Sequence, residues 1–195
     1  VVLNVRPCPF HTYRDAVDAG ICYLTEDRKT QGLFLEMSIK NNMSSANMKG
    51  VSHGIWLDDK LERSLANRFV EQLAIKIPGI EYPISSLSGG NQQKAIIARE
   101  VDRDKPLIVA VQPTRGLDVG AIEYIHSQLV AERDRGKAIL LVSLELDEVM
   151  SLSDRILVLY EGEIVGELDP KKTNIQELGL YMAGAKRAEK GGGTE

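Results

Sequence analysis

Short apolar runs alternate with an amphipathic segment in the second half of the chain, and this alternation is the feature that most limits the fold. The runs are Leu107–Val111, Ala138–Val142 and Ile156–Tyr160, each bounded by turn or charged residues. A segment with helical periodicity, Val119–Arg135, separates the first two. Strand, helix and strand in this order are typical of parallel sheets, so the sequence predicts an α/β fold with a mainly parallel sheet and buried strands.

Helices are predicted from apolar periodicity and capping residues. Asp58 can cap a helix whose apolar residues recur at helical spacing over Leu61–Leu73. A second helix is expected to begin at Ser88. The third spans Val119–Arg135, and Gly136 is its expected C-terminal stop.

The remaining segments complete the expected organisation. Ile21–Leu24 predicts one more strand, and the stretch Glu26–Tyr82 contains no convincing buried strand. This stretch is therefore expected to be a helical insertion between two sheet-forming parts, with a short helix near Ser38–Met43 and with Trp56 packed inside. The two-residue turn Glu161-Gly162 predicts a hairpin on the edge of the sheet.

Composition excludes several classes of protein. The 195 residues include 24 Lys and Arg against 28 Asp and Glu, a net charge of −4, and this mild acidity argues against a nucleic-acid partner. The apolar run Ala138–Val142 is far shorter than the roughly 20 residues of a membrane helix, and no signal peptide is expected. Cys8 and Cys22 form no CxxC pair, so no metal site or disulfide framework is expected. Residues 183–195 are expected to be a disordered tail.

The segment Ser86–Lys94, with the sequence SLSGGNQQK, is a turn that opens into a helix. Ser88 can cap the first turn, while Gly89 and Gly90, which lack a Cβ, leave backbone N–H groups open to an anion at the positive end of the helix dipole. These residues also fit an ordinary capped helix start. By themselves they leave both interpretations open.

Three motifs resemble one family. Residues 87–94, LSGGNQQK, resemble the signature motif of ATP-binding-cassette (ABC) ATPases. Residues 112–121, QPTRGLDVGA, follow an apolar strand and are similar to the Walker B end and D-loop in the second half of tandem ATPases that serve sugar and nucleoside importers. Upstream, residues 14–16 and 20–29 resemble the Q-loop region of the same half, and the resemblance covers residues 12–182.

The resemblance implies a P-loop NTPase fold of ABC type that lacks its first strands. Residues 1–25 would be a remnant of the core sheet, and residues 26–100 the Q-loop region, helical subdomain and signature helix. Residues 101–182 would form the α/β core with Walker B, D-loop and C-terminal hairpin. No Walker A loop, GxxxxGK[ST], occurs in residues 1–195, and in the family this loop precedes the Q-loop.

In this family two cassettes meet head to tail, and each signature motif closes over an ATP held by the other. The resemblance therefore implies that Ser88, Gly89 and Gly90 bind a nucleotide in trans, with Gln92 as a further candidate. Asp118 matches the D-loop Asp and is expected at the partner interface, where it can also cap the following helix. ATP and Mg²⁺ are the implied cofactors, bound mainly by the partner half.

The positions that would carry hydrolysis depart from the family pattern. The pattern requires Asp for Mg²⁺ and then Glu for the attacking water, whereas this chain has Val111 and Gln112. Valine cannot bind a cation, and glutamine cannot accept the proton of water. Leu144 stands at the switch-histidine position. Glu26 stands at the Q-loop position, where its charge fits a triphosphate badly unless a cation or an Arg such as Arg28 lies nearby.

The implied function is that of the C-terminal nucleotide-binding half of an importer ATPase for a simple sugar or a nucleoside, with no ATP hydrolysis at its own site. The string Gln112-Pro113-Thr114 favours the nucleoside type. Expected partners are an N-terminal ATPase half on the same or another polypeptide, membrane permease subunits that contact the insertion and, indirectly, a solute-binding lipoprotein. The expected location is the cytoplasmic face of the membrane, as a peripheral subunit.

Two other functional interpretations stay open at this point. One fold can host many functions, so the chain could be a non-transport module that uses the fold for dimerisation or regulation. The chain could also be an inactive fragment whose missing strands leave an exposed sheet edge.

Overall fold

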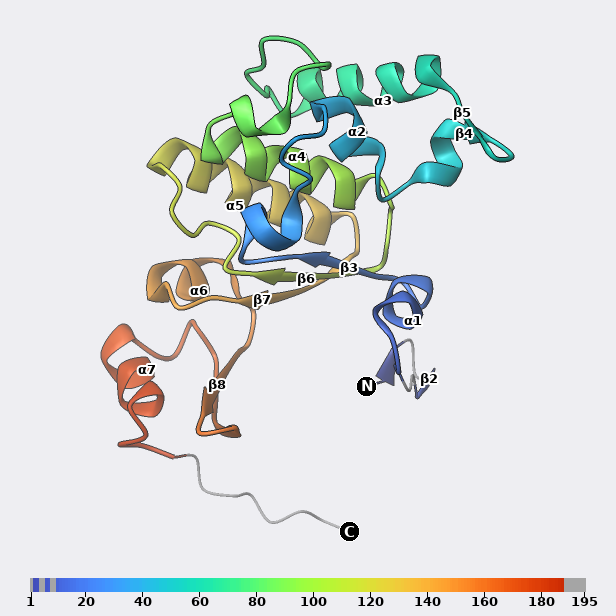
Figure 1. Cartoon of the computed structure of the whole chain (residues 1–195). Coiled ribbons are helices and arrows are strands. Elements are labelled where there is room, and N and C mark those ends of the chain that lie inside the picture. The colour runs from blue at the N-terminus through green and yellow to red at the C-terminus, as the bar shows by residue number, and fades with distance from the viewer. Residues whose placement is uncertain (1, 4–5, 8–9, 188–195) are drawn as a thin grey trace. The chain divides into compact units, whose positions relative to one another are not determined.

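A three-stranded parallel sheet lies at the centre of the first part of the chain (Figure 1). Its strands are β3 (Ile21–Leu24), β6 (Leu107–Val111) and β7 (Ala138–Val142), in the order β3-β6-β7. All three strands were predicted with these bounds, and their parallel arrangement is confirmed.

The structure is a computed structural model that describes residues 2–3, 6–7 and 10–187. The chain divides into two compact units, Val1–Val142 and Ser143–Glu195, and each is described by itself. Cys8 and most of the expected disordered tail lie outside the described residues. No helix of the described ranges is long and apolar enough to cross a membrane.

Two helices pack on the same face of the sheet (Figure 1). The signature helix α4 (Gly89–Val101) precedes β6, and α5 (Val119–Asp134) connects β6 to β7. The predicted caps are confirmed, because the side chains of Ser88 and Asp118 accept bonds from first-turn amides. Helix α5 ends before Gly136, whose φ of +88° suits a residue without a Cβ.

The side chains of β7 alternate between half-buried and exposed. Ile139 and Leu141 pack against the core, but the alternate residues Leu140 and Val142 are 51% and 43% exposed. The prediction that this strand is buried is therefore wrong. The reason is that β7 is the last strand of the sheet and the helices α4 and α5 cover a single face, so every second side chain of β7 meets solvent.

A helical insertion separates β3 from β6, as predicted. A π-helical turn at Arg28–Gly32 comes first, and α2 (Ile39–Ser44) and α3 (Asp59–Gln72) follow. Short 3₁₀ turns span Met48–Val51 and Ile84–Ser86.

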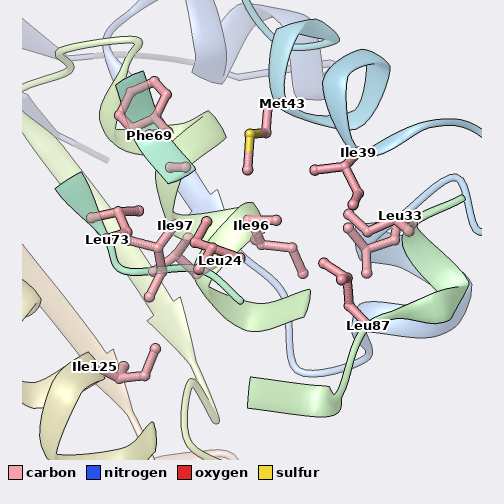
Figure 2. Close-up of a cluster of buried hydrophobic side chains, with 14 of the residues drawn as sticks. Leu24, Leu33, Ile39, Met43, Phe69, Leu73, Leu87, Ile96, Ile97 and Ile125 are labelled. Carbon is pink, nitrogen blue, oxygen red and sulfur yellow. The ribbon is translucent and has the colours of Figure 1, made fainter. Parts of the chain in front are cut away.

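The capping residues and the core of the insertion agree with the predicted helices. Asp58 caps α3 and Ser38 caps α2, which confirms both helix starts. The insertion shares one hydrophobic core with the sheet, in which Met43 and Phe69 pack near Ile96 of α4 (Figure 2). The insertion therefore supports the signature helix directly.

Trp56 differs from its prediction. It lies on a small antiparallel ribbon of β4 (Ser52–His53) and β5 (Trp56–Leu57), and it is 76% exposed rather than packed inside the insertion. The ribbon has two residues in each strand and leaves Ile55 at its turn 92% exposed. An element this short has no inner face in which a tryptophan could be buried.

The N-terminal elements were not predicted as such. They are β1 (Val2–Leu3), β2 (Arg6–Pro7) and α1 (Tyr13–Asp18). A capping box starts α1, because the Thr12 hydroxyl accepts from Asp15 N while the Asp15 carboxylate accepts from Thr12 N.

The second unit contains the predicted hairpin in a different setting. Strands β8 (Ile156–Tyr160) and β9 (Glu163–Leu168) pair around the turn Glu161-Gly162, where both residues have positive φ as the predicted two-residue turn requires. The two strands form a separate sheet instead of joining the edge of the parallel sheet. Their apolar face is covered within the unit by α6 (Leu146–Leu152) and α7 (Ile175–Met182).

Lys94 fastens the signature helix to its two neighbours. Its Nζ donates to the carbonyl oxygens of Leu73 at 3.0 Å and Ala74 at 3.3 Å, just past the end of α3. The same Nζ lies 3.9 Å from the ring centroid of Tyr124 on α5. A charged donor at a helix C-terminus and a cation over an aromatic ring both stabilise the fold.

Lys94→Met is therefore expected to lower the free energy of unfolding by about 1–3 kcal/mol, since it removes the cation–π contact and leaves two carbonyls without their charged donor. Chemical denaturation measures the change. Lys76→Met is the matched control, because Lys76 is an exposed neighbour whose backbone, not its side chain, makes the local hydrogen bond. Equal effects of the two substitutions would contradict the proposed role of Lys94.

Candidate functional site

Ser88 lies at the exposed N-terminal end of α4. Its backbone is extended and its Oγ accepts from Asn91 N at 3.5 Å and from Asn91 Nδ2 at 3.1 Å. The first-turn amides of Gly89 and Gly90 have no carbonyl partner inside the helix, as at any helix start. These amides and the helix dipole make this end of α4 favourable for a negative charge.

Gly90 allows the signature loop to approach the next helix. A Cβ on Gly90 would lie 3.0 Å from Ala121 Cβ and 3.7 Å from Asp118 Oδ2. Asp118 is itself exposed and caps α5 by accepting from Ala121 N at 2.9 Å. The structure therefore brings the predicted signature and D-loop residues together within one chain.

Gln92 faces inward. It is 4% exposed, and its Nε2 donates to the carbonyls of Ile84 at 3.3 Å and Leu87 at 3.2 Å. Its side chain holds the turn before the loop, away from the surface that a nucleotide would reach. Asn91 has a similar supporting role, because its Oδ1 accepts from Lys76 N at 3.1 Å and so links the loop to the end of the insertion.

The end of β6 carries no carboxylate. Val111 pairs with Val142 of β7 and is half-buried, and Gln112 N donates to Val142 O at 2.8 Å. Gln112 has a φ of +47°, in the left-handed region that non-glycine residues seldom adopt. Uncommon backbone of this kind persists where the surrounding structure imposes it, and here the Gln112 carbonyl also accepts from Arg115 N.

Glu26 lies at the same edge of the sheet as Gln112, because both residues follow the carboxyl ends of parallel strands. Its carboxylate is 3.7 Å from Arg115 Nη1, and both side chains are largely exposed. Arg115, not Arg28, is therefore the cation next to Glu26. The exposed pair is expected to contribute little to stability.

Three groups near the loop have shifted pKa values. Hydrogen bonds from the side chain and backbone of Thr30 lower the pKa of Asp27, the residue after Glu26. Burial lowers the pKa of Lys94, and Lys76 lowers it further while Asp118 opposes the shift. Burial raises the pKa of Tyr124, beneath Lys94, to about 12, so that this phenol stays neutral at physiological pH.

Leu144 belongs to the second unit, where its side chain is 71% exposed. It offers no hydrogen-bonding group at the position where the family pattern has histidine.

The sequence pattern gave no role to Asn91 or Lys94, and it gave Arg28 a different role from the one its contacts indicate. Asn91 and Lys94 lie inside the signature string, but their contacts reach Lys76, Leu73 and Tyr124, which only the folded chain brings near. Arg28 was considered only as a counter-charge for Glu26. Its Nη1 instead donates to Arg115 O at 2.9 Å, 87 residues away in sequence.

Comparisons with curated proteins find close relatives, although no protein-family model matches the chain. The chain is 43% identical over 194 residues to the guanosine import ATP-binding protein NupO of Bacillus subtilis, which covers 98% of the chain and 38% of that protein. It is 47% identical over 185 residues to the ribose import ATP-binding protein RbsA 2 of Rhizobium etli, with 93% of the chain and 36% of that protein covered. The chain thus spans little more than a third of the length of these relatives.

Solved structures agree on the fold. The ATP-binding cassette MJ0796, in a dimeric post-hydrolysis state bound to ADP and Pi, has a TM-score of 0.64 at 23% identity, with 77% of this chain and 63% of that chain covered. CbiO1 from Clostridium perfringens, part of the ABC transporter complex cbiONQ, has a TM-score of 0.67 at 19% identity, with 93% and 68% covered. The chain therefore has the α/β fold of ABC ATPases, and over most of its length it is a homologue of the sugar and nucleoside import ATP-binding proteins.

Proposed function

We propose that this chain is the second nucleotide-binding half of an ABC importer for simple sugars or nucleosides, and that it completes the active site of a partner cassette in trans. The observation that carries the proposal is a contrast within one structure. Ser88 is exposed and Gly89 is half-buried at the capped start of α4, and Gly90 is buried against α5. The end of β6, in contrast, offers Val111 and Gln112 in place of two carboxylates.

The loop fits the phosphate end of a nucleotide. The Ser88 hydroxyl and the amides of Gly89 and Gly90 can donate to phosphate oxygens, and the helix dipole favours their negative charge. The guanidinium of Arg28, close to Gly89, adds positive charge beside the loop. Gln92 supports the preceding turn from inside and is not needed for contact.

The chain's own catalytic end does not fit Mg²⁺ or an attacking water. Val111 has no donor atom, and the amide of Gln112 is neutral, whereas Mg²⁺ in nucleotide sites is held through carboxylates and phosphates. Gln112 can bind a water molecule but cannot take its proton. ATP and Mg²⁺ are therefore assigned mainly to the partner half, and no hydrolysis is assigned to this one.

Two comparisons support a two-cassette assembly. The ATP-binding cassette MJ0796 is described as dimeric with ADP and Pi. The named import ATP-binding proteins are far longer than this chain, which spans 38% of NupO and 36% of RbsA 2. We propose a partner cassette on the same polypeptide as these residues or on another one.

We assign the contact with permease subunits to the insertion. Its outer part exposes four large apolar side chains, Met48, Ile55, Trp56 and Leu57. A separate hollow of about 290 Å³ is lined by Asn47, Gly50, Val51, Leu61, Ser64, Leu65, Arg68 and Asp102. Large exposed apolar side chains that gather on one short segment are typical of a protein interface. The contact would hold the subunit at the cytoplasmic face of the membrane.

Ser88→Arg is expected to lower ATP turnover of the intact protein, reconstituted with its permease, by about 10²-fold or more, because the large side chain fills the space of the trans contact. Gln112→Ala is expected to leave turnover near the wild-type rate. Ser85→Arg, at an exposed serine of the same turn, controls for added bulk and charge. If Gln112→Ala is the damaging change, this half has catalytic chemistry of its own and the proposal fails.

Two substitutions of Asp118 separate its role as the cap of α5 from its proposed role at the partner interface. Asp118→Asn is expected to keep the cap and the free energy of unfolding, since Asn caps helices as well as Asp, while lowering ATP turnover about tenfold. Asp118→Ala is expected to lower turnover and also cost about 1 kcal/mol of stability. Denaturation and turnover assays measure the two effects. Wild-type turnover in Asp118→Asn would remove Asp118 from the interface.

A further inference from the structure

Arg28 lies where three segments far apart in the sequence meet. It starts the π-helical turn after β3, and its Nη1 donates to Arg115 O at 2.9 Å in the turn before α5. A Cβ on Gly89 would lie 3.0 Å from Arg28 Nη2, and a Cβ on Gly116 would lie 3.9 Å from the same atom. The guanidinium therefore lies between the signature loop and the Arg115-Gly116 turn.

The far end of the π-helical turn is also fastened to α4. Arg99 Nη1 donates to Gly32 O at 2.8 Å, and a Cβ on Gly32 would lie 2.9 Å from Ile96 Cδ1. The segment Arg28–Gly32 thus runs along the signature helix, with Gly32 against its middle and Arg28 against its first turn. Movement of this segment would be transmitted to the loop.

The hydrogen bonding of Arg28 indicates a positional role. Its Nε is buried and has no hydrogen-bond partner among the described residues. Burying a donor in this way is unfavourable, so the side chain is retained here at a cost to stability. A planar guanidinium can cover the Gly89 backbone and reach a carbonyl at once, which the single ammonium of lysine cannot do.

We infer that Arg28 is a positioning residue for the signature loop. It holds Gly89 against the Arg115-Gly116 turn, so that Ser88 on one side and Asp118 on the other form a single surface toward a nucleotide bound in trans. The inference rests on the proposed function for its catalytic consequence. Its structural part concerns this chain alone.

The test compares hydrogen exchange and turnover in the intact protein. Arg28→Ala is expected to speed exchange of the amides of Gln92, Arg115 and Leu117 about tenfold, because the bond that ties the segments together is lost. It is also expected to lower kcat for ATP about tenfold with little change in KM, since the partner cassette holds the nucleotide. Lys29→Ala, at the exposed next residue, is the matched control.

Gly89→Ala provides a second way to disturb the contact between Arg28 and the signature loop. Its Cβ would meet the guanidinium at 3.0 Å, so it is expected to displace the end of the Arg28 side chain slightly and to speed exchange of the same amides by less than Arg28→Ala does. The double variant is then expected to exchange no faster than Arg28→Ala, because the two changes break one contact. Arg28→Lys keeps the positive charge but removes the planar guanidinium. It is expected to behave like Arg28→Ala, because the ammonium cannot cover the Gly89 backbone and reach the Arg115 carbonyl at once.

Additive exchange effects, wild-type exchange in Arg28→Ala, or faster exchange with unchanged kcat would each overturn the inference. The proposed function is judged separately by Ser88→Arg. If Ser88→Arg abolishes turnover while Arg28→Ala changes nothing, only the role of Arg28 is lost. If Ser88→Arg has no effect, the proposed function itself fails.

Discussion

The close approach of the signature helix to α5 is the contact on which the site depends. Gly90 permits it, because a side chain there would reach Ala121 at 3.0 Å. The approach places the Ser88 loop beside Asp118, and Lys94 secures it by binding the end of α3 and lying over Tyr124. A loop built from glycine and serine has little rigidity of its own, so packing around it must supply the shape that a phosphate would meet.

The carboxyl ends of strands β3 and β6 carry no residues suited to ATP hydrolysis. In a parallel α/β sheet the carboxyl ends of the strands are where chemistry gathers, and here they carry Glu26, Val111 and Gln112. Gln112 has a backbone φ of +47°, which non-glycine residues seldom adopt, and its side chain carries no charge. This chain therefore has a formed signature loop at Ser88, but it has no carboxylates at positions 111 and 112.

Periodicity and capping were sufficient to predict the helices α2, α3, α4 and α5, because Ser38, Asp58, Ser88 and Asp118 each cap a helix locally. Errors arose where distant packing decides. Trp56 is exposed because its ribbon has no inner face. Alternate residues of β7 are exposed because α4 and α5 cover a single face of the sheet, and the β8–β9 hairpin packs against its own helices. In the candidate site, the motif led to Ser88 and Asp118, whose roles stay predictions. It could not predict the contacts of Arg28 or the inward direction of Gln92, since both depend on contacts across the fold.

The central claim is that Ser88 contacts the γ-phosphate position of a nucleotide held by another cassette. Orthovanadate trapped with ADP occupies that position, and under ultraviolet light it oxidises an adjacent serine and cleaves the backbone there. Mass spectrometry of the fragments from the intact, vanadate-trapped transporter reads out the contact. Cleavage at Ser88 is the predicted result, whereas trapping with cleavage beside Gln112, or with none in residues 1–195, would contradict the account.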